Sequence, residues 1–89
     1  MNTQEKQLTV NNRKGIHGRI AARLIKIANK NKVRLNIIYD EKLYDCSSVL
    51  DILSIALVYG ATFKIRIVGK ETEQAMSAVE NLINARGKF

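Results

Sequence analysis

The sequence predicts an α+β fold: an open-faced, two-layer β-sandwich in which a four-stranded antiparallel sheet is covered on one side by three helices. Three segments carry apolar residues at helical spacing, and several short segments alternate apolar with polar residues, as half-buried strands do. Their order along the chain is strand, helix, strand, strand, helix, strand, helix (βαββαβα). The length of 89 residues gives room for one domain, residues 1–89, because a second hydrophobic core would not fit.

The first strand and the first helix are expected near the N-terminus. Residues 8–10 (Leu-Thr-Val) alternate in polarity and predict a short strand, which a polar loop over residues 11–15 ends. From Gly18 the spacing changes to that of a helix with one apolar face, and we expect this helix to end within residues 29–32. The apolar positions are Ile20, Leu24, Ile27 and Ala28.

The middle of the chain predicts a hairpin and a second helix. Residues 35–39 alternate as a strand, residues 40–42 form a polar turn, and Leu43-Tyr44 begins the returning strand. Two adjacent serines, Ser47 and Ser48, then precede a dense apolar stretch. A serine hydroxyl can accept an N–H group that the first turn of a helix leaves unpaired, so we expect an N-cap followed by a short buried helix.

The last part of the chain predicts a strand and a third helix. Residues 63–67 alternate strictly between large apolar and basic side chains, which is typical of a strand with one wet face. Gly69-Lys70 turns the chain into the last helix, for which Gly87 is a natural stop signal. The apolar stripe of this helix is formed by Ala75, Met76, Ala78, Val79, Leu82 and Ile83.

Composition restricts the setting and the partners. The net charge of +7 and the pI near 9.9 favour acidic partners and a salt-dependent association. The single Cys46 cannot form an internal disulfide and has no neighbouring ligands at metal spacing, so neither a secreted scaffold nor a zinc site is expected. The richest apolar run, residues 52–61, is about half the length that a membrane span needs. We therefore expect a soluble, cytoplasmic protein without membrane insertion.

The only histidine of the chain marks a candidate site for carrying a phosphoryl group. His17 lies between flexible glycines at the start of the first predicted helix, two residues from Arg19. An imidazole is a nucleophile that can be neutral near physiological pH, and a helix start offers unpaired N–H groups to an anion. Arg19 could hold phosphate oxygens through its fork of donors. An imidazole that is merely solvated, or that only caps the helix, fits the same spacing.

Two segments resemble a known family. Residues 15–21 (Gly-Ile-His-Gly-Arg-Ile-Ala) resemble the Gly-Ile/Leu-His-Ala-Arg-Pro-Ala signature of HPr, the histidine-containing phosphocarrier of the bacterial sugar phosphotransferase system. Residues 48–55 (Ser-Val-Leu-Asp-Ile-Leu-Ser-Ile) resemble the second HPr signature, a serine followed by Ile-Met-Gly-Val-Met-Ser-Leu. The two segments lie at the separation of the family without a gap, and the resemblance extends from Leu8 to about Ile83. The open-faced β-sandwich of the family agrees with the predicted elements.

The resemblance implies a specific activity. His17 would take a phosphoryl group on Nδ1 from phosphorylated enzyme I and pass it to the A domain of a sugar permease, with Arg19 stabilising the phosphohistidine. Such a protein is a relay component rather than a stand-alone enzyme, and neither a cofactor nor a metal is expected. Ser48 matches the serine that a regulatory kinase modifies, so a serine kinase and a transcriptional regulator are further candidate partners. The expected docking surface comprises Ile20, Val49, Leu50 and Asp51.

The sequence departs from the family pattern at four positions, one of which is Ser47, where the family usually has a lysine before the regulatory serine. Ile20 stands where the family has proline and Gly18 where it has alanine, so the helix start is expected to be less rigid. Asp51 replaces a glycine, and its carboxylate could repel a phosphate on Ser48 if the two side chains approach. Ser48 is therefore either a regulatory phosphorylation site or only a helix N-cap.

The sequence is also compatible with two other functions. The departures at Ile20 and Asp51 also fit a diverged HPr-like regulatory module that contacts a transcription factor or enzyme without efficient phosphotransfer. The net charge also permits nucleic-acid binding through a basic stripe. The low aromatic content of 6%, with no clustered motif for base stacking, argues against this third function. The stripe would comprise Lys26, Lys30, Lys32, Arg34, Lys64 and Arg66.

Overall fold

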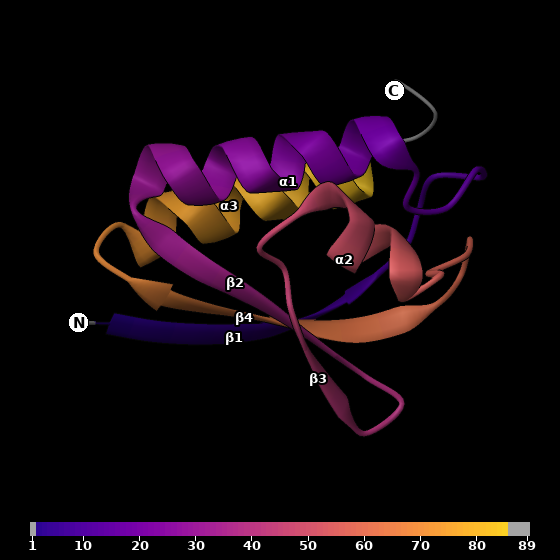
Figure 1. Ribbon diagram of the computed structural model, residues 1–89, viewed down its shortest axis with the longest axis horizontal. Coiled ribbons are helices and arrows are strands. Elements are labelled where there is room, and N and C mark those ends of the chain that lie inside the picture. The colour runs from indigo at the N-terminus through magenta and orange to yellow at the C-terminus, as the bar shows by residue number, and fades with distance from the viewer. Residues whose placement is uncertain (1, 86–89) are drawn as a thin grey trace.

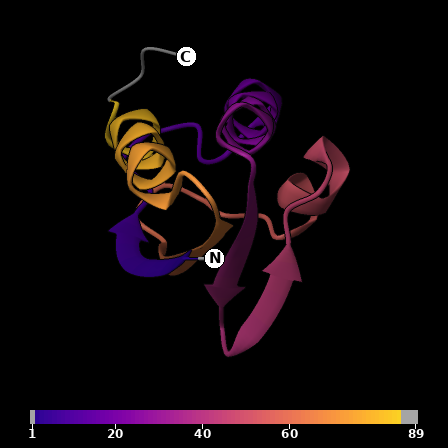
Figure 2. The same ribbon diagram turned by 90° about the vertical axis from the view of Figure 1, so that its left-hand side faces the viewer.

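In the computed structural model, which describes residues 2–85, four antiparallel strands form one sheet and three helices cover one of its faces (Figure 1). The strand order is β1-β4-β2-β3. Figure 2 shows the helices on the same side of the sheet, with α1 between α3 and α2. The predicted fold class and element order are confirmed. The elements are β1 (Asn2–Thr9), α1 (Gly18–Asn31), β2 (Val33–Tyr39), β3 (Lys42–Asp45), α2 (Val49–Ser54), β4 (Thr62–Gly69) and α3 (Thr72–Asn84).

Strand β4 is central and pairs with both β1 and β2. Its Phe63, Ile65 and Ile67 are buried beneath the helices, whereas Lys64 and Arg66 are exposed. The strict alternation of apolar and basic residues thus predicts both faces of this strand correctly. The alternation works because successive side chains of a strand point to opposite faces and only one face of this sheet is covered.

Strand β1 is longer than the alternation of residues 8–10 predicts. It runs from Asn2 to Thr9 and pairs with β4 along its whole length, while Val10 lies beyond its end. Leu8 is the one fully buried side chain of the strand, so its other residues carry little apolar signal. Backbone hydrogen bonds to a neighbouring strand require no apolar side chain, and the polar sequence therefore hid most of the strand.

The hairpin between β2 and β3 has a two-residue turn. Asp40 and Glu41 have φ angles of 53° and 64°. Left-handed backbone at both positions is what a type I′ turn requires, and this turn matches the twist of the paired strands. Lys42, which the sequence places in the turn, instead pairs with Tyr39 as the first residue of β3.

The helices bury their apolar faces against the sheet, although α2 does so only in part. Ile20 and Leu24 of α1 are buried, and so is the predicted stripe of α3 except for Ala78, which is partly exposed. The expectation that α2 is a buried helix is wrong: Ile52 is its only fully buried residue, and Leu50 is 77% exposed. With six residues, α2 can direct only one narrow face inward.

Helix α3 ends at Asn84, and the predicted stop at Gly87 lies outside the described residues. Among residues 2–85, no helix is both long enough and apolar enough to cross a membrane.

The thiol of Cys46 should make the stability of the fold depend on pH. Burial raises the pKa of this thiol from 9.0 to about 12, and the nearby Asp45 carboxylate acts in the same direction. The unfolded chain loses the thiol proton first, so the thiol favours unfolding increasingly as the pH rises from about 9 towards about 12. Between pH 8 and pH 10.5, we expect the free energy of unfolding to fall by up to about 2 kcal/mol more in the native chain than in Cys46→Ala. Urea unfolding of both proteins measures this difference, and a parallel pH dependence would contradict the prediction.

Candidate functional site

The loop between β1 and α1 holds the candidate site and is fixed to the segment that follows α2. The Ile16 N–H donates to the Leu57 carbonyl at 2.9 Å, and the Gly15 N–H donates to the Asn12 carbonyl at 2.9 Å. Gly15 has a φ of +74°, and a Cβ at this position would lie 2.6 Å from the Leu57 oxygen. Both the backbone conformation and the close approach require glycine here. The loop is therefore anchored to the rest of the fold just before His17.

His17 is the N-cap of α1. Its Nδ1 accepts a hydrogen bond from the Arg19 N–H at 3.3 Å, and its carbonyl accepts from the Ala21 N–H at 3.0 Å. The side chain is half-buried. A nitrogen that accepts a hydrogen bond has an available lone pair, so in the neutral ring Nδ1 is the unprotonated nitrogen and Nε2 carries the proton. The nucleophilic lone pair thus faces the N-terminus of α1.

The surroundings of His17 favour a negative charge. The N–H groups of Gly18, Arg19 and Ile20 lie in the first turn of α1, where no preceding carbonyl of the helix can accept them. The aligned peptide dipoles add partial positive charge there, and the first turn contains no acidic residue. Arg19 is exposed and adds a full positive charge. An anionic group attached to Nδ1 would therefore be stabilised by backbone donors and by charge.

Ser48 caps α2 as the sequence predicts. Its Oγ accepts a hydrogen bond from the Asp51 N–H at 3.1 Å. The Asp51 carboxylate in turn accepts a hydrogen bond from the Ser47 hydroxyl at 3.0 Å. Both serines and Asp51 are exposed. Capping does not close the Ser48 hydroxyl to other groups, so its role in regulation stays a prediction.

The residues expected to form a docking surface have different positions. Leu50 is 77% exposed and Val49 is partly exposed on α2. Ile20 has no exposed surface, so its predicted role in partner docking is wrong. Residues four apart lie on the same side of a helix, and Ile20 shares with Leu24 the side of α1 that packs into the core.

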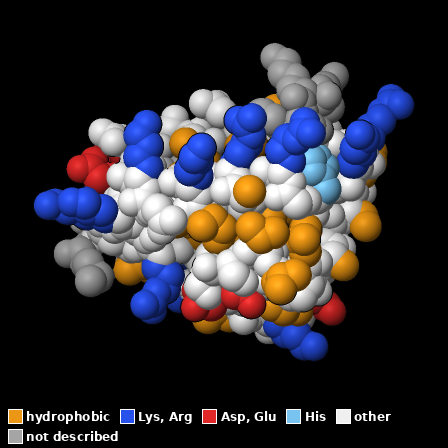
Figure 3. Space-filling view, turned by 45° about the horizontal axis from the view of Figure 1, so that its top comes forward, with side chains coloured by type: hydrophobic (Ala, Val, Ile, Leu, Met, Phe, Trp, Pro, Cys, Tyr) orange, Lys and Arg blue, Asp and Glu red, His pale blue; other side chains and the backbone are white. Residues whose placement is uncertain are grey.

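Two exposed apolar residues near the loop of His17 were missed by sequence reasoning. Val58 and Tyr59 are 64% and 58% exposed, in the segment that precedes β4. They follow Leu57, whose carbonyl accepts the hydrogen bond from Ile16. The sequence did not distinguish them because they belong to an apolar run that also contains buried residues. The signal in the sequence that could have indicated a surface turn here is the adjacent Gly60. In Figure 3, hydrophobic side chains gather beside the pale blue histidine, next to a row of Lys and Arg side chains.

The predicted basic stripe is not one surface. Arg34, Lys64 and Arg66 alternate with the buried strand residues and so lie on the open face of the sheet, whereas Lys26 and Lys30 are on α1. The sheet separates the two groups, so these basic residues do not form one continuous surface for binding a nucleic acid. In the described part of the chain, no group of three His, Cys, Asp or Glu residues is placed to bind a metal ion.

Fold and site together define a class of protein: a small open-faced α+β sandwich that presents one half-buried histidine at a helix N-terminus, beside exposed apolar side chains. The family model for the phosphorylation site of the HPr component of the phosphotransferase system (PTS) matches residues 4–85. The chain therefore belongs to the HPr phosphocarrier family of the PTS.

Individual relatives agree with this assignment. A phosphocarrier protein HPr of Lysinibacillus sphaericus is 31% identical over 87 residues, which cover 98% of this chain and 97% of that protein. A phosphocarrier protein NPr of Shewanella violacea is 29% identical over 86 residues, covering 97% of this chain and 94% of that protein. The crystal structure of an HPr from Bacillus anthracis matches with a TM-score of 0.81 at 26% identity, covering 91% of this chain and 96% of that one.

The two glycines that flank His17 should respond oppositely to alanine. Gly15→Ala forces a Cβ against the Leu57 carbonyl in left-handed backbone, so we expect it to lower the free energy of unfolding by about 2 kcal/mol. Gly18→Ala meets no atom within 4 Å and stiffens the unfolded chain, so we expect a gain of about 0.5–1 kcal/mol. Urea unfolding measures both values, and a loss of similar size in both variants would contradict the prediction.

The cap of α2 can be tested with a neighbouring serine as control. Ser48→Ala removes the acceptor of the Asp51 N–H and should lower the free energy of unfolding by about 1 kcal/mol. Ser47→Ala removes only an exposed bond between side chains and should change stability by less than about 0.5 kcal/mol. Equal effects in urea unfolding would show that Ser48 is not the stabilising cap.

Proposed function

We propose that this chain accepts a phosphoryl group from phosphorylated enzyme I on Nδ1 of His17 and passes it to the A domain of a sugar permease. The observation that carries the proposal is the Nδ1 lone pair at the N-terminus of α1, in a chain that belongs to a family of phosphocarriers. Enzyme I and the permease domains are the partners that the resemblance implies.

The geometry supports direct transfer without a proton step at the nucleophile. Nδ1 of His17 attacks phosphorus, and the new N–P bond forms as the bond from phosphorus to the donor breaks. Because Nδ1 is already unprotonated, the Nε2 proton stays in place. The Arg19 N–H exchanges its bond to Nδ1 for a bond to a phosphate oxygen, and the Arg19 guanidinium supplies further donors.

The partly exposed position of the site suits a carrier that must also release its phosphoryl group. A half-buried imidazole with one nearby arginine and a helix terminus stabilises the phosphoryl group only moderately. A deep cage of donors would stabilise the phosphorylated state more than transfer and would slow release. We assign docking of both partners to the exposed apolar side chains near the site, which include Leu50, Val58 and Tyr59.

The departure at Ile20 does not displace the site. Helix α1 still begins at Gly18 with His17 as its cap, and the Ile20 side chain fills the core. This packing weakens one of the two reasons for preferring a regulatory module without efficient phosphotransfer, while the expected lower rigidity of the helix start stays a prediction. The other reason is Asp51, which is exposed on α2. Its charge would change the affinity for partners and the proposed regulatory phosphorylation of Ser48.

The proposal predicts that phosphoryl acceptance depends on His17 alone. His17→Asn keeps a side-chain oxygen that can cap α1 but has no nucleophilic nitrogen, so it should stay folded and accept no phosphoryl group. Ser48→Ala, the matched control, should still be phosphorylated at the histidine. Incubation with enzyme I and phosphoenolpyruvate, followed by intact-mass analysis, should show one acid-labile phosphoryl group on the native chain and on the control.

A reference HPr labelled in parallel shows that the enzyme I is active. Under that condition, an unlabelled native chain would favour the regulatory module over the relay. Labelling of the folded His17→Asn variant to the native extent would show that another residue is the acceptor. Circular dichroism confirms that each variant is folded before it is tested.

A further inference from the structure

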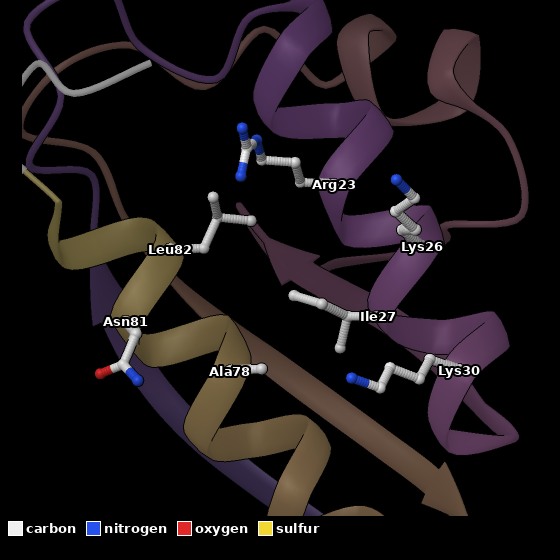
Figure 4. A pocket seen from close by; sticks show the side chains of 7 residues that line it. All are labelled: Arg23, Lys26, Ile27, Lys30, Ala78, Asn81 and Leu82. Atoms are coloured by element: carbon white, nitrogen blue, oxygen red, sulfur yellow. The ribbon is translucent and has the colours of Figure 1, made fainter.

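A second surface, separate from the phosphoryl site, lies between α1 and α3. An open groove of about 410 Å³ runs between these helices (Figure 4). Its floor is apolar: Figure 4 shows Ile27 and Leu82 pointing into the space between the helices, with Ala78 beside them. Within residues 2–85, its lining comprises Arg23, Lys26, Ile27, Lys30, Ala78, Asn81 and Leu82.

The rim of the groove on the α1 side is strongly basic. Arg23, Lys26 and Lys30 are spaced at i, i+3 and i+7, so they form one ridge along the helix. Helix α1 contains no acidic residue to offset them. Within residues 2–85, the ion pairs found join Lys6 to Glu80 and Arg66 to Glu5, so neither Lys26 nor Lys30 has an acidic partner there.

The acidic residues of α3 also lie away from this rim. Glu80 is bound to Lys6 of β1 at 2.9 Å, on the other side of the helix. Glu73 lines a different hollow, next to the start of β1. The groove therefore combines an apolar floor with two lysines, Lys26 and Lys30, for which residues 2–85 supply no ion pair.

The spacing of the basic ridge indicates an elongated ligand. From Arg23 to Lys30 the helix rises about 10 Å, or two turns, at 1.5 Å per residue. One small anion would engage only one part of such a row, whereas a helix with carboxylates at i, i+4 and i+7 would engage all of it. The apolar floor matches the hydrophobic stripe of an amphipathic helix. Among residues 2–85, no aromatic side chain lines the groove for base stacking, which argues against single-stranded nucleic acid.

We propose that the groove between α1 and α3 is a docking site for an acidic amphipathic helix of a partner protein. Helix α1 separates this groove from α2, which packs on its other side. A partner in the groove would therefore leave the exposed residues of α2 accessible. This second interface does not depend on whether His17 carries a phosphoryl group.

The test uses a designed 18-residue helical peptide with a leucine stripe and glutamates at i, i+4 and i+7 along its edge. NMR titration of the isotope-labelled protein should shift the amide signals around Ile27, Ala78 and Leu82, and the affinity should fall at least 5-fold from 50 to 300 mM salt. A peptide with glutamine in place of each glutamate should bind at least 10-fold more weakly.

Variants of the protein locate the site. The double substitution Lys26→Glu and Lys30→Glu, and separately Ala78→Glu on the floor, should each weaken peptide binding at least 10-fold. The matched controls are Lys64→Glu, the same charge change on the open sheet face, and Ser77→Glu, the same new residue on α3 outside the groove lining. Both controls should bind within about 2-fold of the native chain.

Other outcomes would overturn the proposal. Equal binding of the glutamine peptide would show that charge does not select the ligand. Shifts confined to α2 and the loop of His17 would place the peptide on the phosphoryl-transfer surface. Tighter binding of a single-stranded oligonucleotide, weakened by the same groove variants, would make the groove a nucleic-acid site. An unchanged affinity in both groove variants would show that the peptide does not bind in the groove.

Discussion

The candidate site depends on one close backbone contact, between Gly15 and the carbonyl of Leu57. These residues are far apart in sequence, yet the contact joins the loop that presents His17 to the segment between α2 and β4. A side chain at Gly15 would push the two segments apart. Because His17 follows two residues later and caps α1, this contact sets where the helix begins and where the imidazole lies. The chemistry that we propose at Nδ1 therefore depends on a packing constraint outside the helix.

Helix α1 combines several roles because its surfaces face different neighbours. Its start directs N–H groups and positive charge towards Nδ1 of His17. Its buried side, with Ile20 and Leu24, joins the core, and α2 and α3 pack on either flank. The basic ridge that ends at Lys30 runs along its exposed side. Surfaces that share a rigid helix keep a fixed spacing, so the two docking surfaces that we propose would stay apart on the same element.

The departures from the family signature differ in their consequences because of burial. Ile20, which stands where the HPr signature has proline, is fully buried and packs in the core, while the expected lower rigidity of the helix start stays a prediction. Asp51 replaces a glycine at an exposed position in the first turn of α2, where its N–H binds Ser48 and its carboxylate binds Ser47. That change adds charge to the exposed surface of α2, which we propose for partner docking. The first departure concerns packing, and the second concerns recognition.

The sequence by itself predicted the fold class, the order of the elements, the cap at Ser48 and the histidine at a helix start. These features depend on local rules: the periodicity of apolar residues, and side chains that can accept helix N–H groups. It did not show most of β1, because polar residues 2–7 gain their strand conformation from pairing with β4. Neighbouring strands supply those backbone hydrogen bonds, and no local pattern records them.

Only the tertiary structure decided which apolar residues are exposed. Ile20 of α1 is buried and Leu50 of α2 is largely exposed, although both are apolar residues of predicted helices, because exposure depends on what packs against each helix. The structure also divided the basic residues between the open sheet face and α1, and it brought α3 beside α1 to form the groove. Sequence determines which face of an element is apolar, whereas the packing of distant elements determines which parts of that face remain accessible to a partner.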